Sequence, residues 1–114
     1  MMDGITVDGY RFDGPYILNK DTVPAEAGII LISTEAGEGI KFLCIEESND
    51  MAAFIENSDK KDFWLKTAYH GQIDLYIMRT DCSDAERASI VDSMIHRREA
   101  YLLCQEKKIL EDDW

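Results

Sequence analysis

Residues 28–45 read GIILISTEAGEGIKFLCI, and this stretch decides the fold. Its first part, residues 28–33, is almost entirely aliphatic, which is typical of a strand that is buried on both faces. Its last part, residues 40–45, is a second apolar run, and a short loop with two glycines separates the two runs. Two such runs around a glycine-containing loop predict an antiparallel β-hairpin.

The residues after the hairpin predict two helices and a third strand. Asp50 is a suitable N-cap residue for a helix over residues 51–57, where apolar side chains follow helical spacing. A second helix is expected over residues 60–69, with Gly71 just beyond its end. Residues 72–78 are rich in apolar and aromatic side chains, and we expect them to add a strand to the same sheet.

A long helix is expected to follow the third strand. Residues 83–86 read SDAE, a capping-box pattern, and apolar residues continue at helical spacing as far as Leu102. Residues 1–14 are polar and predict a lead-in with no more than a short strand near residues 5–7, and Gly14-Pro15 is a turn signal. The expected fold is therefore α/β (α+β), a small, mostly antiparallel three-stranded sheet with packed helices.

Composition indicates one acidic domain over residues 1–114. The chain has 46% hydrophobic and 31% charged residues, the balance of a globular protein, and its net charge is −11. Nucleic acids and anionic membranes attract basic surfaces, so this charge argues against both as partners. Residues 105–114 form an acidic tail. The polar start and the odd number of cysteines (Cys44, Cys82 and Cys104) favour a cytoplasmic protein without disulfides.

Several segments, taken in order, resemble a GIY-YIG endonuclease domain over about residues 14–103. The resemblance is carried by Gly14-Pro15-Tyr16, Val23-Pro24, Ala27-Gly28-Ile29-Ile30, the stretch Lys41-Phe42-Leu43-Cys44-Ile45-Glu46-Glu47-Ser48-Asn49-Asp50-Met51, and Ala85-Glu86-Arg87 with Ile90-Val91. The family implies an α/β fold around a small antiparallel sheet and metal-dependent attack on a DNA phosphodiester. Its working residues are two tyrosines, an arginine on the first helix and a metal-binding glutamate on the last helix.

In this chain those working positions hold other residues. The two tyrosine positions fall on Ile30 and Cys44, the arginine position on Phe54 and the glutamate position on Val91. Phosphodiester cleavage needs a base, a cation facing the developing charge and usually a metal. Isoleucine, phenylalanine and valine supply none of these, and the glutamates after Cys44 oppose ionisation of its thiol. The resemblance therefore implies a degenerate domain without catalytic residues, and no cofactor is expected.

Other polar clusters have an ordinary and a functional interpretation. Glu46, Glu47 and Asp50 form an acidic cluster that is either a helix cap or a divalent-metal site. His70 and His96 have no metal-ligand spacing. The basic pairs Arg97-Arg98 and Lys107-Lys108 are either helix-end cations or a phosphate-binding patch. The aromatic pair Phe63-Trp64 belongs either to the core or to an interface.

These observations favour a catalytically inactive, GIY-YIG-like protein-binding or regulatory module. We expect a protein partner or a second copy to dock on Ile30, Glu46, Glu47, Asp50 and Phe54, an apolar patch with an acidic rim. The competing interpretation is that Ile30 and Phe54 belong to the core. The alternative function is a divergent metal-dependent nuclease that uses Glu46, Glu47 and Asp50 with Asp92 and a relocated tyrosine such as Tyr16.

Overall fold

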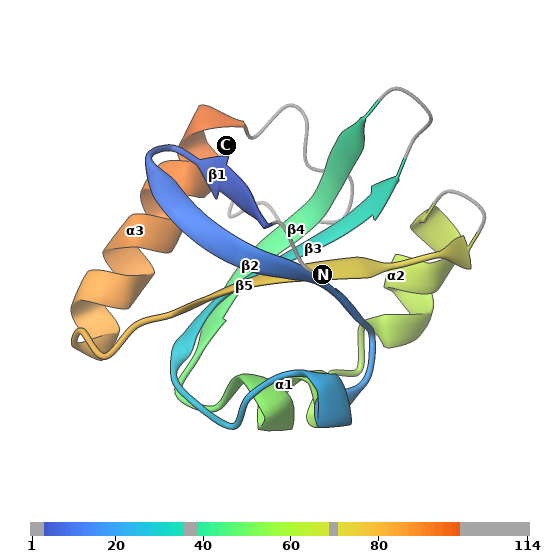
Figure 1. Cartoon of the computed structure of the whole chain (residues 1–114), viewed down its shortest axis with the longest axis horizontal. Coiled ribbons are helices and arrows are strands. Elements are labelled where there is room, and N and C mark those ends of the chain that lie inside the picture. Colours follow the sequence, from blue (N-terminus) through green and yellow to red (C-terminus); the bar gives the residue numbers. More distant parts are fainter. Residues whose placement is uncertain (1–3, 36–38, 69–70, 99–114) are drawn as a thin grey trace, which may run out of the picture.

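A computed structural model describes residues 4–35, 39–68 and 71–98, and it shows an α+β fold (Figure 1). The elements follow in the order β1 (Ile5–Val7), β2 (Tyr10–Ile17), a 3-10 turn η1 (Lys20–Thr22), β3 (Gly28–Glu35), β4 (Ile40–Ser48), α1 (Met51–Asn57), α2 (Lys61–Thr67), β5 (Asp74–Arg79) and α3 (Asp84–Arg97). The strands form one antiparallel sheet in the order β1-β2-β5-β3-β4. Among these residues no helix is long and apolar enough to cross a membrane.

The predicted hairpin and third strand are confirmed. β3 pairs with β4 from Gly28 opposite Ser48 to Glu35 opposite Ile40, and β3 pairs with β5 on its other side. The first helix and the capping box are also confirmed, since the Ser83 hydroxyl accepts from the Glu86 amide at 3.1 Å. The expected continuation of the last helix through Leu102, like Cys104 and the acidic tail, lies outside the described residues.

The sheet has five strands, so the expectation of three is wrong. The short strand near residues 5–7 is present as β1, but β2 was expected to be lead-in and turn. Gly14-Pro15 lies inside β2, where the pairing with β5 shifts register between Asp13 and Tyr16. A side chain at Gly14 would lie 2.6 Å from the Leu75 carbonyl oxygen, so glycine permits this close approach. The Gly-Pro pair therefore makes an irregularity within a strand rather than a turn.

Alternating side chains of β3 divide the core into two layers. Ile30 and Ile32 face α1 and α2, in a cluster that includes Met51, Ile55 and Trp64. Ile29 and Leu31 face the other way, in a cluster that includes Val7, Phe12, Val91 and Met94. α3 and the β1-β2 hairpin therefore cover one face of the sheet, and α1 and α2 cover the other.

The turn of the β1-β2 hairpin is fixed to the end of α3. Asp8 and Gly9 both have positive φ, 55° and 87°, as a two-residue hairpin turn requires. The Arg98 guanidinium donates to both Asp8 carboxylate oxygens, at 2.8 and 2.9 Å. These hydrogen bonds hold the pKa of Asp8 below its usual range. The pair therefore joins the first hairpin to the last helix.

We predict that Asp8→Asn destabilises the protein by about 1 kcal/mol at neutral pH. Because folding lowers the pKa of Asp8, its contribution is complete above the unfolded pKa of about 3.9 and is lost as the pH falls through the folded pKa. Urea unfolding of both proteins between pH 7 and pH 2 measures this difference, which should shrink below about pH 4. Asp92→Asn, at an exposed position of α3, is the control. A difference that stays constant with pH would contradict this assignment.

Candidate functional site

The four positions at which the GIY-YIG pattern has working residues are divided between the two faces of the sheet. Ile30 and Cys44 are 0% and 1% exposed in the cluster beneath α1 and α2, and Phe54 packs against that cluster. Val91, on α3, belongs to the cluster on the opposite face. The sheet separates Val91 from the other three positions, so the four side chains do not form one site.

The expected interaction surface changes because Ile30 is fully buried. A side chain of β3 that faces α1 and α2 cannot contact a partner, so the expectation that Ile30 lines this surface is wrong. Phe54 is different, because its ring is half-buried on α1 and stacks in a tilted arrangement on Trp64, with centroids 6.2 Å apart. Of the two apolar residues expected at this surface, only Phe54 reaches solvent.

The acidic cluster does not converge on one point. Asp50 is the N-cap of α1, and its carboxylate accepts from the Ala53 amide at 3.0 Å, as the helix-cap interpretation predicts. Glu47 accepts from the Arg87 guanidinium at 2.8 Å. Glu46 lines a surface hollow. Within the described ranges, no group of three His, Cys, Asp or Glu side chains is placed to hold a metal ion.

Arg87 is the most buried charged side chain among the residues that the structure describes, at 2% exposure. Its guanidinium donates to Glu47, to the Asn49 side chain at 2.6 Å, to Asp84 and to the Cys82 carbonyl at 3.3 Å. The hydrogen bond to Glu47 raises the pKa of Arg87, against the opposing effect of burial. This network fixes the start of α3 to the end of β4 and gives Glu47 a structural role.

The sequence does contain one signal for this network: a charged residue stands on the apolar stripe of α3. Arg87, Val91 and Met94 are spaced i, i+4 and i+7, and they are the buried residues of α3. A charged residue on the apolar stripe of a helix must find partners, because an unpaired buried charge is costly. Its partners Glu47 and Asn49 lie about forty positions away along the chain, so the sequence does not identify them.

A hollow of about 310 Å³ lies beside Phe54, at the end of α1. It is lined by Phe54 and Glu46 and by the turn between α1 and α2, residues Asn57, Ser58, Asp59 and Lys60. The Lys60 amide donates to the Ser58 hydroxyl at 3.3 Å, which shapes this turn. The residues around the hollow carry one aromatic ring, two carboxylates, an amide, a hydroxyl and an ammonium group. It therefore brings together two of the expected surface residues, Glu46 and Phe54.

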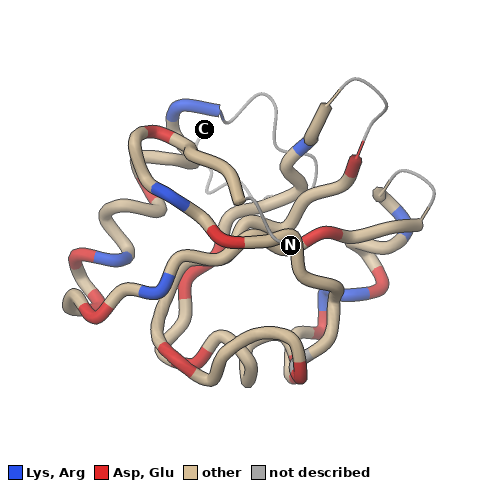
Figure 2. Tube along the Cα trace, viewed as in Figure 1, with Lys and Arg blue, Asp and Glu red and all other residues tan. Residues whose placement is uncertain are grey.

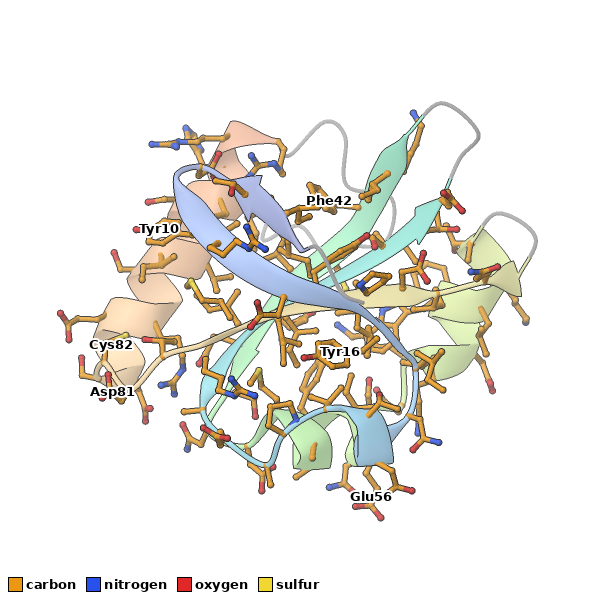
Figure 3. The ribbon with its side chains drawn as sticks, in the orientation of Figure 1. Tyr10, Tyr16, Phe42, Glu56, Asp81 and Cys82 are labelled. Atoms are coloured by element: carbon orange, nitrogen blue, oxygen red, sulfur yellow. The ribbon has the colours of Figure 1, made fainter. Side chains whose placement is uncertain are left out.

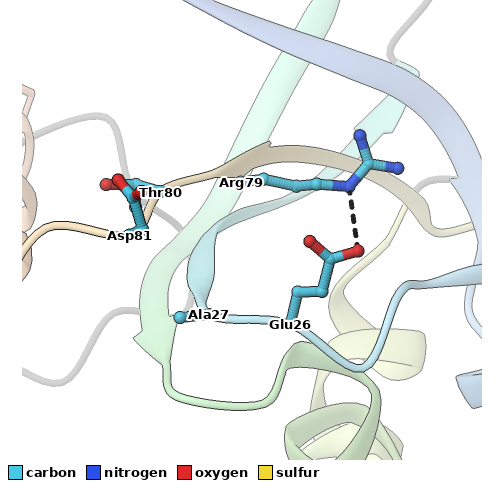
Figure 4. Close-up of a pocket in the computed structure, with 5 residues that line it drawn as sticks. All are labelled: Glu26, Ala27, Arg79, Thr80 and Asp81. Carbon is cyan, nitrogen blue, oxygen red and sulfur yellow. Dashed lines mark ion pairs between the residues drawn. The ribbon is translucent and has the colours of Figure 1, made fainter.

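A second hollow, of about 360 Å³, lies where β5 ends and β3 begins (Figure 4). It is lined by Glu26, Ala27, Arg79, Thr80 and Asp81. Arg79 and Glu26 form an ion pair at 3.4 Å, and both side chains are more than half exposed. An exposed pair of this kind contributes little to stability. The Thr80 hydroxyl donates a hydrogen bond to the Cys82 sulfur, so this side chain stabilises the turn before α3.

The other candidates have structural roles or lie elsewhere. Arg98 binds Asp8, and Arg97 is a largely exposed helix-end cation 3.5 Å from the same carboxylate. Trp64 is buried, whereas Phe63 is exposed. His96 is exposed near the end of α3, and His70 and Lys107-Lys108 lie outside the described residues.

The residues of the nuclease alternative also lie apart. Tyr16 packs against the cluster on the α1 face of the sheet (Figure 3). Asp92 is exposed on α3, which covers the opposite face. Within residues 4–35, 39–68 and 71–98, acidic side chains are spread over strands, turns and helices (Figure 2).

Comparison with models of protein families, with curated proteins and with solved structures gives no match to this chain.

We predict that Arg87→Met destabilises the protein by about 3 kcal/mol, because it leaves Glu47 and the Cys82 carbonyl without their cationic partner. Arg97→Met is the matched control, since Arg97 is 61% exposed, and it should cost about 0.5 kcal/mol or less. Chemical denaturation measures both. Adding Glu47→Gln to Arg87→Met should cost less than Glu47→Gln alone. Equal losses for Arg87→Met and Arg97→Met would refute a structural role for the network.

Proposed function

We propose that this chain is a catalytically inactive, GIY-YIG-like domain that acts as a protein-binding or regulatory module. One observation carries the proposal: the positions expected to do chemistry hold Ile30, Cys44, Phe54 and Val91, and these pack in or against the two core layers. Buried apolar side chains stabilise the sheet but cannot transfer protons or bind hard cations. A scaffold that keeps its core without these groups is suited to binding rather than cleavage.

The engagement of the acidic residues supports the same proposal. Glu47 is paired with Arg87, and Asp50 caps α1. A metal-binding role would require both to leave these partners, at the cost of a buried guanidinium and a helix cap. Tyr16 and Asp92 are separated by the sheet. The nuclease alternative therefore has less support from these residues than the binding module.

The proposed interaction surface is the hollow beside Phe54, together with the turn that closes it. Ile30 is left out, while Glu47 and Asp50 support the surface from their structural positions. The chain has a net charge of −11, and such charge steers basic partners toward it. We therefore propose a basic protein partner, with a second copy of the chain as the other occupant to test.

We predict no cleavage of plasmid or single-stranded DNA and RNA in the presence of Mg²⁺ or Mn²⁺. The test compares wild type with Glu46→Ala after identical purification, so that a contaminating nuclease is recognised by its presence in both. Nicking that follows the wild-type protein and disappears in Glu46→Ala would establish the nuclease alternative and overturn the proposal.

We predict that filling the hollow blocks the partner. Asn57→Trp adds bulk at the end of α1, and Asp92→Trp adds the same bulk at an exposed position of α3 on the other side of the sheet. A partner captured by cross-linking to the wild-type chain should bind Asn57→Trp at least about tenfold more weakly and Asp92→Trp unchanged. Sedimentation over a range of concentrations shows whether that partner is a second copy. Equal binding by both variants would place the interaction elsewhere.

A further inference from the structure

We infer that the hollow beside Phe54 receives an arginine side chain from a basic segment of the partner, an inference that rests on the proposed function. Its volume of about 310 Å³ lies at the lower end of the range for ligand pockets. That space suits one long side chain rather than a helix or a strand. The hollow would therefore recognise a single anchoring residue, as small hot-spot pockets at protein interfaces do.

The aromatic wall of the hollow favours a cation. Phe54 stacks on Trp64 with an angle of 35° between the ring planes, and Trp64 is fully buried, so the Phe54 ring has a fixed backing. Because Phe54 itself is half-buried and lines the hollow, part of its ring is available to a guest. A guanidinium packed on a phenylalanine ring gains from cation–π attraction and from flat contact between planar groups.

The polar lining has the matching charge. Glu46 and Asp59 contribute two carboxylates against the single ammonium of Lys60, and Asn57 adds an amide that can accept a hydrogen bond. The nearby Lys61 ammonium does not line the hollow, because it donates to the Glu56 carbonyl at the end of α1, at 3.1 Å. The net charge of −11 therefore supplies the general attraction for a cation, and the carboxylates at the hollow supply its local acceptors.

Geometry favours arginine over lysine. A guanidinium presents five N–H donors in one plane, so it can stack on Phe54 while donating edge-on to a carboxylate or amide. A lysine ammonium is a compact, strongly hydrated charge, so losing its water on binding costs more free energy than it does for a guanidinium. The hollow should therefore prefer arginine to lysine, a preference that attraction between opposite charges alone would not produce.

The test uses nine-residue synthetic peptides of glycine and serine that contain three arginines, three lysines or three citrullines. Citrulline keeps the planar shape of arginine and removes its charge. In a Trp114→Phe background, Trp64 is the remaining tryptophan, and its contact with Phe54 makes its fluorescence a reporter for the hollow. We expect the arginine peptide to bind most tightly, the lysine peptide about three- to fivefold more weakly and the citrulline peptide weakest.

Variants locate the binding. Asp59→Asn should weaken the arginine peptide about three- to fivefold, and Lys60→Met should strengthen it by a similar factor. Asp62→Asn removes the same charge from an exposed position of α2 that does not line the hollow, and it should have little effect. Phe54→Leu should reduce the preference for arginine over lysine, and urea unfolding checks that this variant remains folded.

Two outcomes would overturn the inference. Equal binding of the arginine and citrulline peptides would show that the hollow does not recognise the guanidinium charge. Equal effects of Asp59→Asn and Asp62→Asn would show that the peptide is attracted only by the net charge of the chain. The proposed function is judged separately, by the captured partner. The captured partner could lose binding to Asn57→Trp and yet bind the wild type equally well after its own arginines are replaced. That result would support the proposed binding function and refute the arginine anchor.

Discussion

The structure depends on one constraint: β3 has no face that can be left in water. Its residues Ile29 to Ile32 are all fully buried, so side chains that alternate between two faces require cover on both. α1 and α2 supply that cover on one side, and α3 with the first hairpin supplies it on the other. The same constraint keeps Ile30 from solvent and places Val91 in a different layer from Cys44 and Phe54. The arrangement of core side chains therefore decides which of the four positions that match the GIY-YIG working residues can reach a surface.

Polar interactions fix the elements that apolar packing alone leaves free to slide. Arg87 joins the start of α3 to Glu47 and Asn49, at the point where β4 leads into α1. Burial of a charged group contributes little net stability, but it penalises arrangements in which the charge lacks its partners. Glu47 and Asp50 thereby hold the frame against which Glu46 and Phe54 are presented. The acidic cluster thus consists of residues with different roles, two of them structural and one at the edge of a hollow.

Local signals in the sequence predicted most of the local structure, and the error lies in the first hairpin, at β2 and its turn. The β3-β4 hairpin, the Asp50 cap and the capping box at Ser83 each depend on residues within a few positions. β2 has few buried residues, and its Gly14-Pro15 pair has the form of a turn. The dipeptide Asp8-Gly9, a strong hairpin signal, was nevertheless present between β1 and β2.

The candidate site was predicted in part for the same reason. Glu46 and Phe54 line the hollow because the end of β4 and the start of α1 are adjacent in the chain. The burial of Ile30 could not be read from periodicity, because a continuous apolar run has the same pattern on both of its faces. The partners of Arg87, about forty positions away, depend on how the chain returns on itself. Pairing over such distances has no signature in a single sequence.

The order of the strands also determines when each part of the chain can fold. β2 pairs with β5 rather than with β3, so the first hairpin can join the sheet only after β3, β4, both short helices and β5 have been made. Closing a loop of that length costs conformational entropy, and contacts between distant residues slow folding. During synthesis on the ribosome, β3 and β4 can pair as soon as both have emerged, before β5 is available to join them to β2. The link from Asp8 to Arg98, which spans 90 positions, would then be among the last contacts made, so we expect the growing chain to complete its second core layer only after α3 has emerged.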